Sequence, residues 1–140
     1  MTAQRCVVVG YDGSTDAQSA VAWAARTAAA LGARLRVVHA VGLLEHAGMA
    51  GHTPVDGGVA LKIASEAGLD PGAVEWHVVD GDPCTAMLRM AEPPEVATLL
   101  VVGSRGSGGH AGTLLGSTSL ELAEHSPVPV TIVPTSYRGG

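Results

Sequence analysis

Short runs of apolar residues alternate along the chain with longer segments in which apolar residues, mostly Ala, recur at helical spacing. The apolar runs are rich in Val and are bounded by Gly, Asp or Pro, which is typical of buried strands. They predict five strands, at residues 5–10, 34–41, 74–79, 98–103 and 128–133. The segments between them predict helices at residues 15–31, 59–67, 83 to about 92 and about 117–125.

Residue types at the segment ends support these boundaries. Ser14 and Asp82 are good N-caps, and Gly32 suits the end of the first helix. Two stretches show no lasting period. Residues 42–58 predict a mobile loop that leaves a short helix after it, and residues 135–140 predict a frayed tail.

Strands and helices that alternate in this way predict a doubly wound α/β domain. Strands that are apolar throughout need helices over both faces, and a strand–helix–strand unit pairs its strands in parallel. We therefore expect a single domain over residues 1–140. Its sheet should be five-stranded and mostly parallel, in the order 3-2-1-4-5, with helices on both faces.

Composition narrows the class of protein. Of the 140 residues, 46% are hydrophobic and 15% are charged, which suits one folded domain, and without Phe the core must consist of Val, Ala and Leu. The net charge of −5, with Lys62 as the single lysine, argues against nucleic-acid binding. The apolar runs are far shorter than the ~20 residues that a membrane span needs.

The cysteines and the start of the chain indicate a cytoplasmic protein. Cys6 and Cys84 make neither a disulfide framework nor a metal-binding set. Residues 1–5 lead directly into the first strand, so no signal peptide is expected.

Two strand ends differ from ordinary turns, at residues 10–14 and 103–118. Ligands of doubly wound sheets bind beyond the C-terminal ends of the strands, where the strand order reverses. In the second stretch, glycines would let backbone amides approach an anion, and Ser117 and Thr118 would open a helix whose free N–H groups attract phosphate. Thr118 with Glu121 also fits a capping box. Because turns are rich in glycine as well, an ordinary loop is the alternative.

The glycine spacing is more specific than the composition. Gly103-x-x-Gly106 is followed after nine residues by Gly116-Ser117. The segments VVVGYDGS, VVHAV, DGDP, LLVVGSRGSGG, LLGSTS and HSPVPVTIVP follow one another along nearly the whole chain. In this spacing and order the chain resembles the ATP-binding branch of the universal stress protein family. The loop is not a Walker A motif, because no Lys follows Gly116, nor a Rossmann fingerprint, whose glycines would follow the first strand.

The resemblance implies a regulatory stress-response protein that binds ATP together with magnesium. It implies that the ligand is held by Val9, Tyr11, Asp12, Ala40, Gly103, Gly106, Gly116, Ser117 and Thr118. In this assignment the backbone of Ala40 meets the adenine, Val9 and Tyr11 line the adenine or ribose wall, and the glycines with Ser117 and Thr118 hold ribose and phosphates.

Asp12 corresponds to the family's acidic residue at the nucleotide site. Because a carboxylate beside a triphosphate would be repelled, Asp12 should hydrogen-bond ribose hydroxyls or a magnesium ion. The alternative is a turn in which Asp12 binds its own backbone. Two features depart from the family pattern, namely the short second helix and His110. We expect the His110 side chain to face solvent.

The sequence indicates no catalytic and no metal site in the protein itself. His46, His52 and His77 lack the close spacing of a zinc site, and nothing resembles a nucleophile with its base. Asp12 is the only candidate base, and Arg105 is the only cation near the glycine-rich loop. Slow ATP hydrolysis is therefore one alternative function. The other is a stress protein that acts through protein partners without nucleotide, which the intact glycine spacing argues against.

The last predicted strand indicates a homodimer. Residues 128–133 form an apolar edge strand at the end of the chain, and an uncovered edge favours pairing with another chain. The resemblance implies antiparallel pairing of this strand across a two-fold axis. Pro127 and Pro129 limit the amides that can take part.

Overall fold

The sheet is five-stranded and wholly parallel, as the computed structural model shows for residues 5–41, 55–93, 96–105 and 116–138. Its strands are β1 Cys6–Gly10, β2 Arg34–Val41, β3 Val74–Asp80, β4 Leu99–Gly103 and β5 Val130–Val133. They lie in the order β3-β2-β1-β4-β5, and each hydrogen-bonded pair is parallel. This confirms the predicted α/β class and the predicted strand order.

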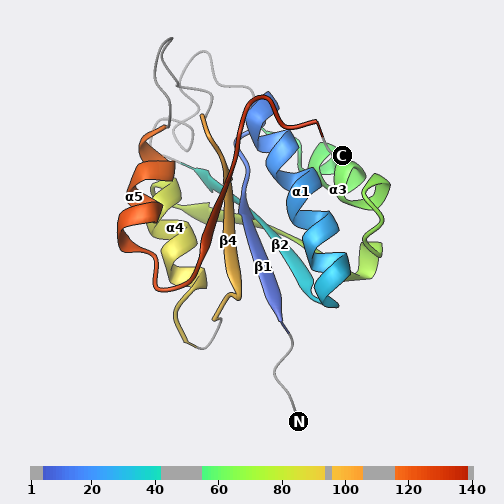
Figure 1. Ribbon diagram of the computed structural model, residues 1–140, viewed down its shortest axis with the longest axis horizontal. Coiled ribbons are helices and arrows are strands. Elements are labelled where there is room, and N and C mark those ends of the chain that lie inside the picture. The colour runs from blue at the N-terminus through green and yellow to red at the C-terminus, as the bar shows by residue number, and fades with distance from the viewer. Residues whose placement is uncertain (1–4, 42–54, 94–95, 106–115, 139–140) are drawn as a thin grey trace.

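Helices cover both faces of the sheet. They are α1 Thr15–Leu31, α3 Gly57–Glu66, α4 Pro83–Met90 and α5 Ser117–His125, with a short 3-10 turn at Pro71–Ala73 before β3. Helices α1 and α3 lie on one face, and α4 and α5 lie on the other (Figure 1). From β1 the chain adds β2 and then β3 on one side of β1. It then crosses to the other side of β1, where it adds β4 and then β5. The strand order therefore reverses between β1 and β4.

Two apolar layers result, because successive residues of a strand point to opposite faces. Val7, Val9, Leu35 and Val37 pack against the alanines of α1 on the first face. On the second face, the buried residues that pack together include Val8, Val38, Leu100, Met87 and Leu122. The small alanines on α1 let this helix approach the sheet closely. The four strand residues that face it are therefore fully buried, although the core contains no Phe.

The predicted caps of the first and third helices are confirmed. The Ser14 side chain accepts a hydrogen bond from the Ala17 amide, and the Asp82 side chain accepts one from Thr85. Gly32 adopts a left-handed conformation, with φ of 65°, which a side chain would disfavour.

Two elements start two residues away from the predicted position. Helix α3 begins at Gly57 rather than at residue 59, because Asp56 caps it. Strand β5 begins at Val130 rather than at residue 128, after Pro129, whose carbonyl still accepts a hydrogen bond from the Leu100 amide. The remainder of the predicted loop, residues 42–54, lies outside the described residues.

The frayed tail predicted at residues 135–140 is wrong for residues 135–138. Tyr137 packs on the α1 side of the sheet, and its hydroxyl accepts a hydrogen bond from Arg26 of α1 at 3.0 Å. The Thr135 hydroxyl donates to the Asp16 carboxylate at 2.9 Å. These contacts join positions more than a hundred residues apart, so no local pattern could reveal them.

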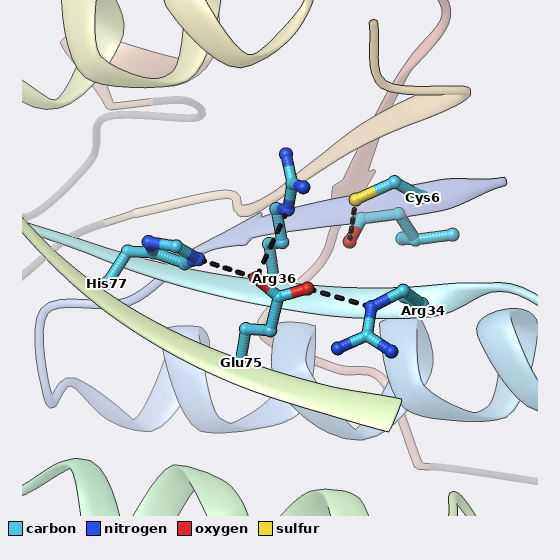
Figure 2. A network of polar contacts seen from close by, with 6 residues as sticks. Cys6, Arg34, Arg36, Glu75 and His77 are labelled. Atoms are coloured by element: carbon cyan, nitrogen blue, oxygen red, sulfur yellow. Dashed lines mark hydrogen bonds and ion pairs between the residues drawn. The ribbon is translucent and has the colours of Figure 1, made fainter. Parts of the chain in front are cut away.

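A charged network lies on β2 and β3 (Figure 2). The Glu75 carboxylate accepts a hydrogen bond from Arg34 Nε at 2.8 Å, and its other oxygen lies 3.0 Å from His77 Nε2 and 3.5 Å from Arg36 Nε. Burial alone would raise the pKa of Glu75. The hydrogen bonds from Arg34 and His77, with the charge of Arg36, outweigh it and hold the pKa below its ordinary value.

We expect Glu75→Gln to be less stable than the wild type by about 1 kcal/mol at pH 7, because the neutral amide loses charge-assisted hydrogen bonds. Since folding lowers the pKa of Glu75, its contribution is present above the pKa of the unfolded chain and is lost as pH falls through the folded value. The difference between the variants should therefore shrink below about pH 4. Urea unfolding at pH 7 and pH 3 measures it. Glu124→Gln, on the exposed face of α5, is the control and should change stability little at either pH. A difference that persists at pH 3 would contradict this role.

Candidate functional site

The C-terminal ends of β1 and β4 meet where the strand order reverses. Because all strands are parallel, the turn after β1 and the segment after β4 leave the sheet at the same edge. This brings together the two stretches that the sequence singled out, around Asp12 and around Gly103. Of the predicted site residues, only Gly106 lies outside the described residues. His110, which was not assigned to the site, also lies outside them.

The turn after β1 is held by its own backbone and by the Asp12 side chain. The Tyr11 amide donates to the Val38 carbonyl at 2.8 Å, and the Asp12 carboxylate accepts a hydrogen bond from the Ser14 amide at 2.9 Å. The turn contact proposed as the alternative for Asp12 is thus present. It does not preclude a ligand, because an ionised carboxylate has about four acceptor positions.

Three aromatic side chains, Tyr11, His39 and Trp76, pack together at this turn. His39 and Tyr11 are 7% and 5% exposed, and His39 Nδ1 lies 3.0 Å from the Tyr11 carbonyl oxygen. The Trp76 ring stacks on His39 and meets Tyr11 edge to face, with centroids 6.0 Å apart in both pairs. Burial raises the pKa of Tyr11, with a further contribution from the negative charge of Asp12, so its phenol is neutral at physiological pH.

Sequence reasoning missed Trp76. The only available signal was its place in β3, where alternation puts it on the same face as Val74. Val9 is fully buried in the first apolar layer, and Ala40 is half-buried near the end of β2, where it packs against the second layer.

At the end of β4, Gly103 is required by the approach of α1. A Cβ at this position would lie 2.9 Å from the carbonyl carbon, the carbonyl oxygen and the Cβ of Asp16. The Ser119 hydroxyl of α5 donates to the Gly103 carbonyl at 2.8 Å. Gly103 therefore lets three elements meet at one point.

Helix α5 begins at this same point. Gly116 is its N-cap, with φ of −73°, and the Gly116 amide donates to the Ser104 carbonyl at 2.6 Å. The capping box predicted from Thr118 and Glu121 is wrong, because the N-cap is Gly116, two residues before Thr118, and no side chain caps the helix. Ser117 is exposed and Thr118 is half-buried in the first turn. A helix N-terminus without a side-chain cap can offer its amides to an anion.

Asp16, in the first turn of α1 that follows the Asp12 turn, contacts the segment after β4. One oxygen of its carboxylate, Oδ2, accepts hydrogen bonds from the Ser104 hydroxyl and the Arg105 amide, both at 3.1 Å, and from Thr135. The sequence contained no signal for this residue beyond an acidic side chain near a helix start.

A sequence model of the universal stress protein family matches residues 5–134. The chain belongs to the universal stress protein family. Among its relatives, a universal stress protein of Mycobacterium tuberculosis is 36% identical over an alignment of 143 positions, gaps included, which covers 91% of this chain and 46% of the relative. A universal stress protein of Mycobacterium bovis is 31% identical over an alignment of 157 positions, gaps included, which covers 94% of this chain and 49% of the relative. The chain thus spans about half the length of the curated relatives that it matches.

Solved universal stress proteins share the fold. One, in complex with cAMP, is 34% identical and superposes with a TM-score of 0.71, covering 96% of this chain and 100% of the other. Another, from Archaeoglobus fulgidus in complex with dAMP, is 20% identical with a TM-score of 0.67, covering 95% and 99%. The family match confirms the predicted membership of the universal stress protein family.

Other candidate chemistry in this universal stress protein domain is sparse. No group of three or more His, Cys, Asp or Glu side chains that could hold a metal ion is found in the described part of the chain. Within the same residues, no helix is long and apolar enough to cross a membrane. Cys6 and Cys84 are both buried, and burial raises the pKa of the Cys84 thiol, with Glu121 and Asp82 adding to it. A thiol with a raised pKa is a poor nucleophile.

Proposed function

We propose that this domain binds ATP with magnesium at the C-terminal edge of β1 and β4, and that it acts in the cytoplasm as a regulatory module of a stress response. The observation that carries the proposal is the meeting of three features at that edge, namely the Asp12 turn, the close-packed Gly103 and the uncapped start of α5. The relative at 34% identity that was solved with cAMP supports an adenine nucleotide as the ligand.

Each part of the site has a distinct task in this proposal. The amides at the start of α5, at Ser117 and Thr118, receive phosphate oxygens, where the helix dipole favours negative charge. Asp12 binds the ribose hydroxyls or the magnesium ion. The adenine meets the backbone at Ala40 and the wall beside Tyr11.

Magnesium fits this arrangement, although no three-carboxylate cluster is present among the described residues. Magnesium sites at nucleotides are commonly formed by phosphate oxygens, water and one or two carboxylates. The ion would neutralise phosphate charge, and Asp12 is the carboxylate at this edge that could contact it.

Binding without efficient turnover is the function that these residues support. Phosphoryl transfer needs a positioned water, a base and charge neutralisation at the transferred group. In the described part of the chain, Asp12 is the candidate base, and its carboxylate already accepts the Ser14 amide. Arg105 is the candidate cation, and its side chain is exposed.

Isothermal titration of the purified domain with Mg-ATP, ADP, AMP and cAMP tests the proposal, after native mass spectrometry has shown whether a nucleotide is retained through purification. We expect ATP to bind more tightly than cAMP, because cAMP lacks the β- and γ-phosphates. If cAMP binds at least tenfold more tightly than ATP, the ligand is an adenine nucleotide but not ATP. If none of the four binds, the domain acts through partners without nucleotide.

We propose further that the domain forms a homodimer through β5. Among the described residues β5 pairs with β4 alone. The Pro129 carbonyl accepts a hydrogen bond from Leu100 of β4, and the Val133 carbonyl accepts one from Ser104 directly after β4. The backbone groups of the alternate residues Val130 and Ile132 therefore point to the open edge. An unpaired apolar edge favours pairing with a second copy.

Analytical ultracentrifugation at micromolar concentration should show a dimer. Val130→Pro should shift it to monomer, because it removes an outward amide while leaving the hydrogen bonds to β4 intact. Leu120→Lys, at an exposed apolar position on α5, is the control and should leave the dimer unchanged. A wild-type protein that sediments only as a monomer would contradict the proposal.

A further inference from the structure

We propose that Asp16 is a positioning residue of the nucleotide site, which sets the distance between the Asp12 turn and the start of α5. This inference rests on the proposed function. Asp16 does not itself touch the ligand in this account. It acts through Ser104, Arg105 and Gly116, the described residues at the two ends of the glycine-rich segment.

The Asp16 carboxylate is buried, and one of its two oxygens accepts several hydrogen bonds. The residue is 9% exposed, and Oδ2 accepts three hydrogen bonds, from Ser104 Oγ, the Arg105 amide and Thr135 Oγ1, at 2.9 to 3.1 Å. A buried carboxylate is retained only where donors replace its water. These donors come from the end of β4 and from the tail after β5, so the contact is tertiary.

Capping of α1 does not require this carboxylate. The Ser14 side chain already accepts the Ala17 amide as N-cap of the helix. Acidic side chains are also favoured near a helix N-terminus by the helix dipole, but such a position needs no buried partners. The three donors on Oδ2 therefore indicate a task outside α1.

The contacts lead from Asp16 to the start of α5 in two steps. The Asp16 carboxylate holds Ser104 by its hydroxyl, and the Ser104 carbonyl accepts the Gly116 amide at 2.6 Å. Because Gly103 has no side chain, the backbone of Asp16 can lie directly against β4. Only three residues lie between Asp12 and Asp16. A shift of Asp16 would therefore change the spacing between the carboxylate expected to meet ribose and the amides expected to meet phosphate.

Asp16→Ala tests this role when the affinities for Mg-ATP and adenosine are compared. Only ATP uses the start of α5. We expect the Kd for ATP to rise about tenfold and the Kd for adenosine to stay within about twofold of wild type, since a few lost hydrogen bonds correspond to a change of this order. Asp16→Asn keeps the shape and one carbonyl oxygen, so it should show a smaller loss and replaces the alanine variant if that variant fails to fold.

Asp70→Ala is the matched control. Asp70 also accepts a backbone amide, that of Gly72 at 3.1 Å, but it precedes β3 at the opposite edge of the sheet. Both Kd values should be unchanged in this variant. A second measurement needs no nucleotide, because the Arg105 and Gly116 amides should exchange hydrogen faster in Asp16→Ala than in wild type.

The outcomes separate this inference from the function on which it rests. If the wild type binds neither ATP nor adenosine, the proposed function fails, and the positioning role fails with it. If the wild type binds ATP, two results overturn the role of Asp16 alone. The first is an equal loss of affinity for ATP and for adenosine in Asp16→Ala, which would show that Asp16 contributes only to folding. The second is an unchanged affinity for ATP together with unchanged amide exchange at Arg105 and Gly116.

Discussion

Gly116→Val is expected to weaken ATP binding at least about thirtyfold, or about 2 kcal/mol, while the domain stays folded. Gly116 is the N-cap of α5 and its amide is bound to the Ser104 carbonyl, so a branched side chain would stand at the start of the helix where phosphate is expected. Its φ of −73° is open to valine, so backbone strain contributes nothing and the loss must come from the bulk of the side chain. Isothermal titration with Mg-ATP measures the effect, and thermal unfolding verifies the fold.

Gly72→Val is the control for this experiment. Gly72 lies in the 3-10 turn before β3, is exposed, and has only the Asp70 carboxylate near its missing Cβ, at 3.7 Å. The same added side chain should leave ATP affinity unchanged there. Asp12→Ala should fall between the two variants, because it removes hydrogen bonds without blocking the site. Wild-type affinity in a folded Gly116→Val protein would show that phosphate does not bind at the start of α5.

Gly103→Ala is expected to destabilise the fold by about 2–3 kcal/mol, the upper part of the usual range for inserting atoms into a packed interior. The added Cβ would lie 2.9 Å from backbone atoms and the Cβ of Asp16, none of which can rotate away. Either α1 or β4 must move, and the hydrogen bonds of Asp16 and Ser119 at this point would lengthen. Urea unfolding of the two proteins at pH 7 gives the difference in free energy.

Gly10→Ala, at the end of the neighbouring strand, separates the close approach from a general effect of alanine in the sheet. Its added Cβ would lie 2.8 Å from Met87 Sδ, the far part of a flexible side chain that can change rotamer. We expect it to cost clearly less than Gly103→Ala. If both variants lose the same stability, or if Gly103→Ala loses none, α1 does not limit the space at Gly103.

Local patterns determined the elements and the family. Val-rich runs and alanine-rich segments define strands and helices by their periodicity, and Ser14, Gly32 and Asp82 act as caps through contacts within a few residues. The alternation of these elements restricts the fold to doubly wound parallel sheets. The expected order 3-2-1-4-5 is one of these, and it is the order observed. The glycine spacing from Gly103 to Gly116 led to the family that the comparison confirmed.

Only the tertiary structure decided how the candidate site is held together. Gly103 suggested a ligand contact from its sequence, but the fold adds a second reason for glycine there, the backbone of Asp16. Asp16 meets Ser104 and Thr135 across separations of 88 and 119 residues, and Trp76 reaches Tyr11 and His39 across β2 and β3. Such contacts depend on which strands become neighbours and how closely α1 packs. No periodicity or local residue preference encodes them, because each residue looks ordinary within its own segment.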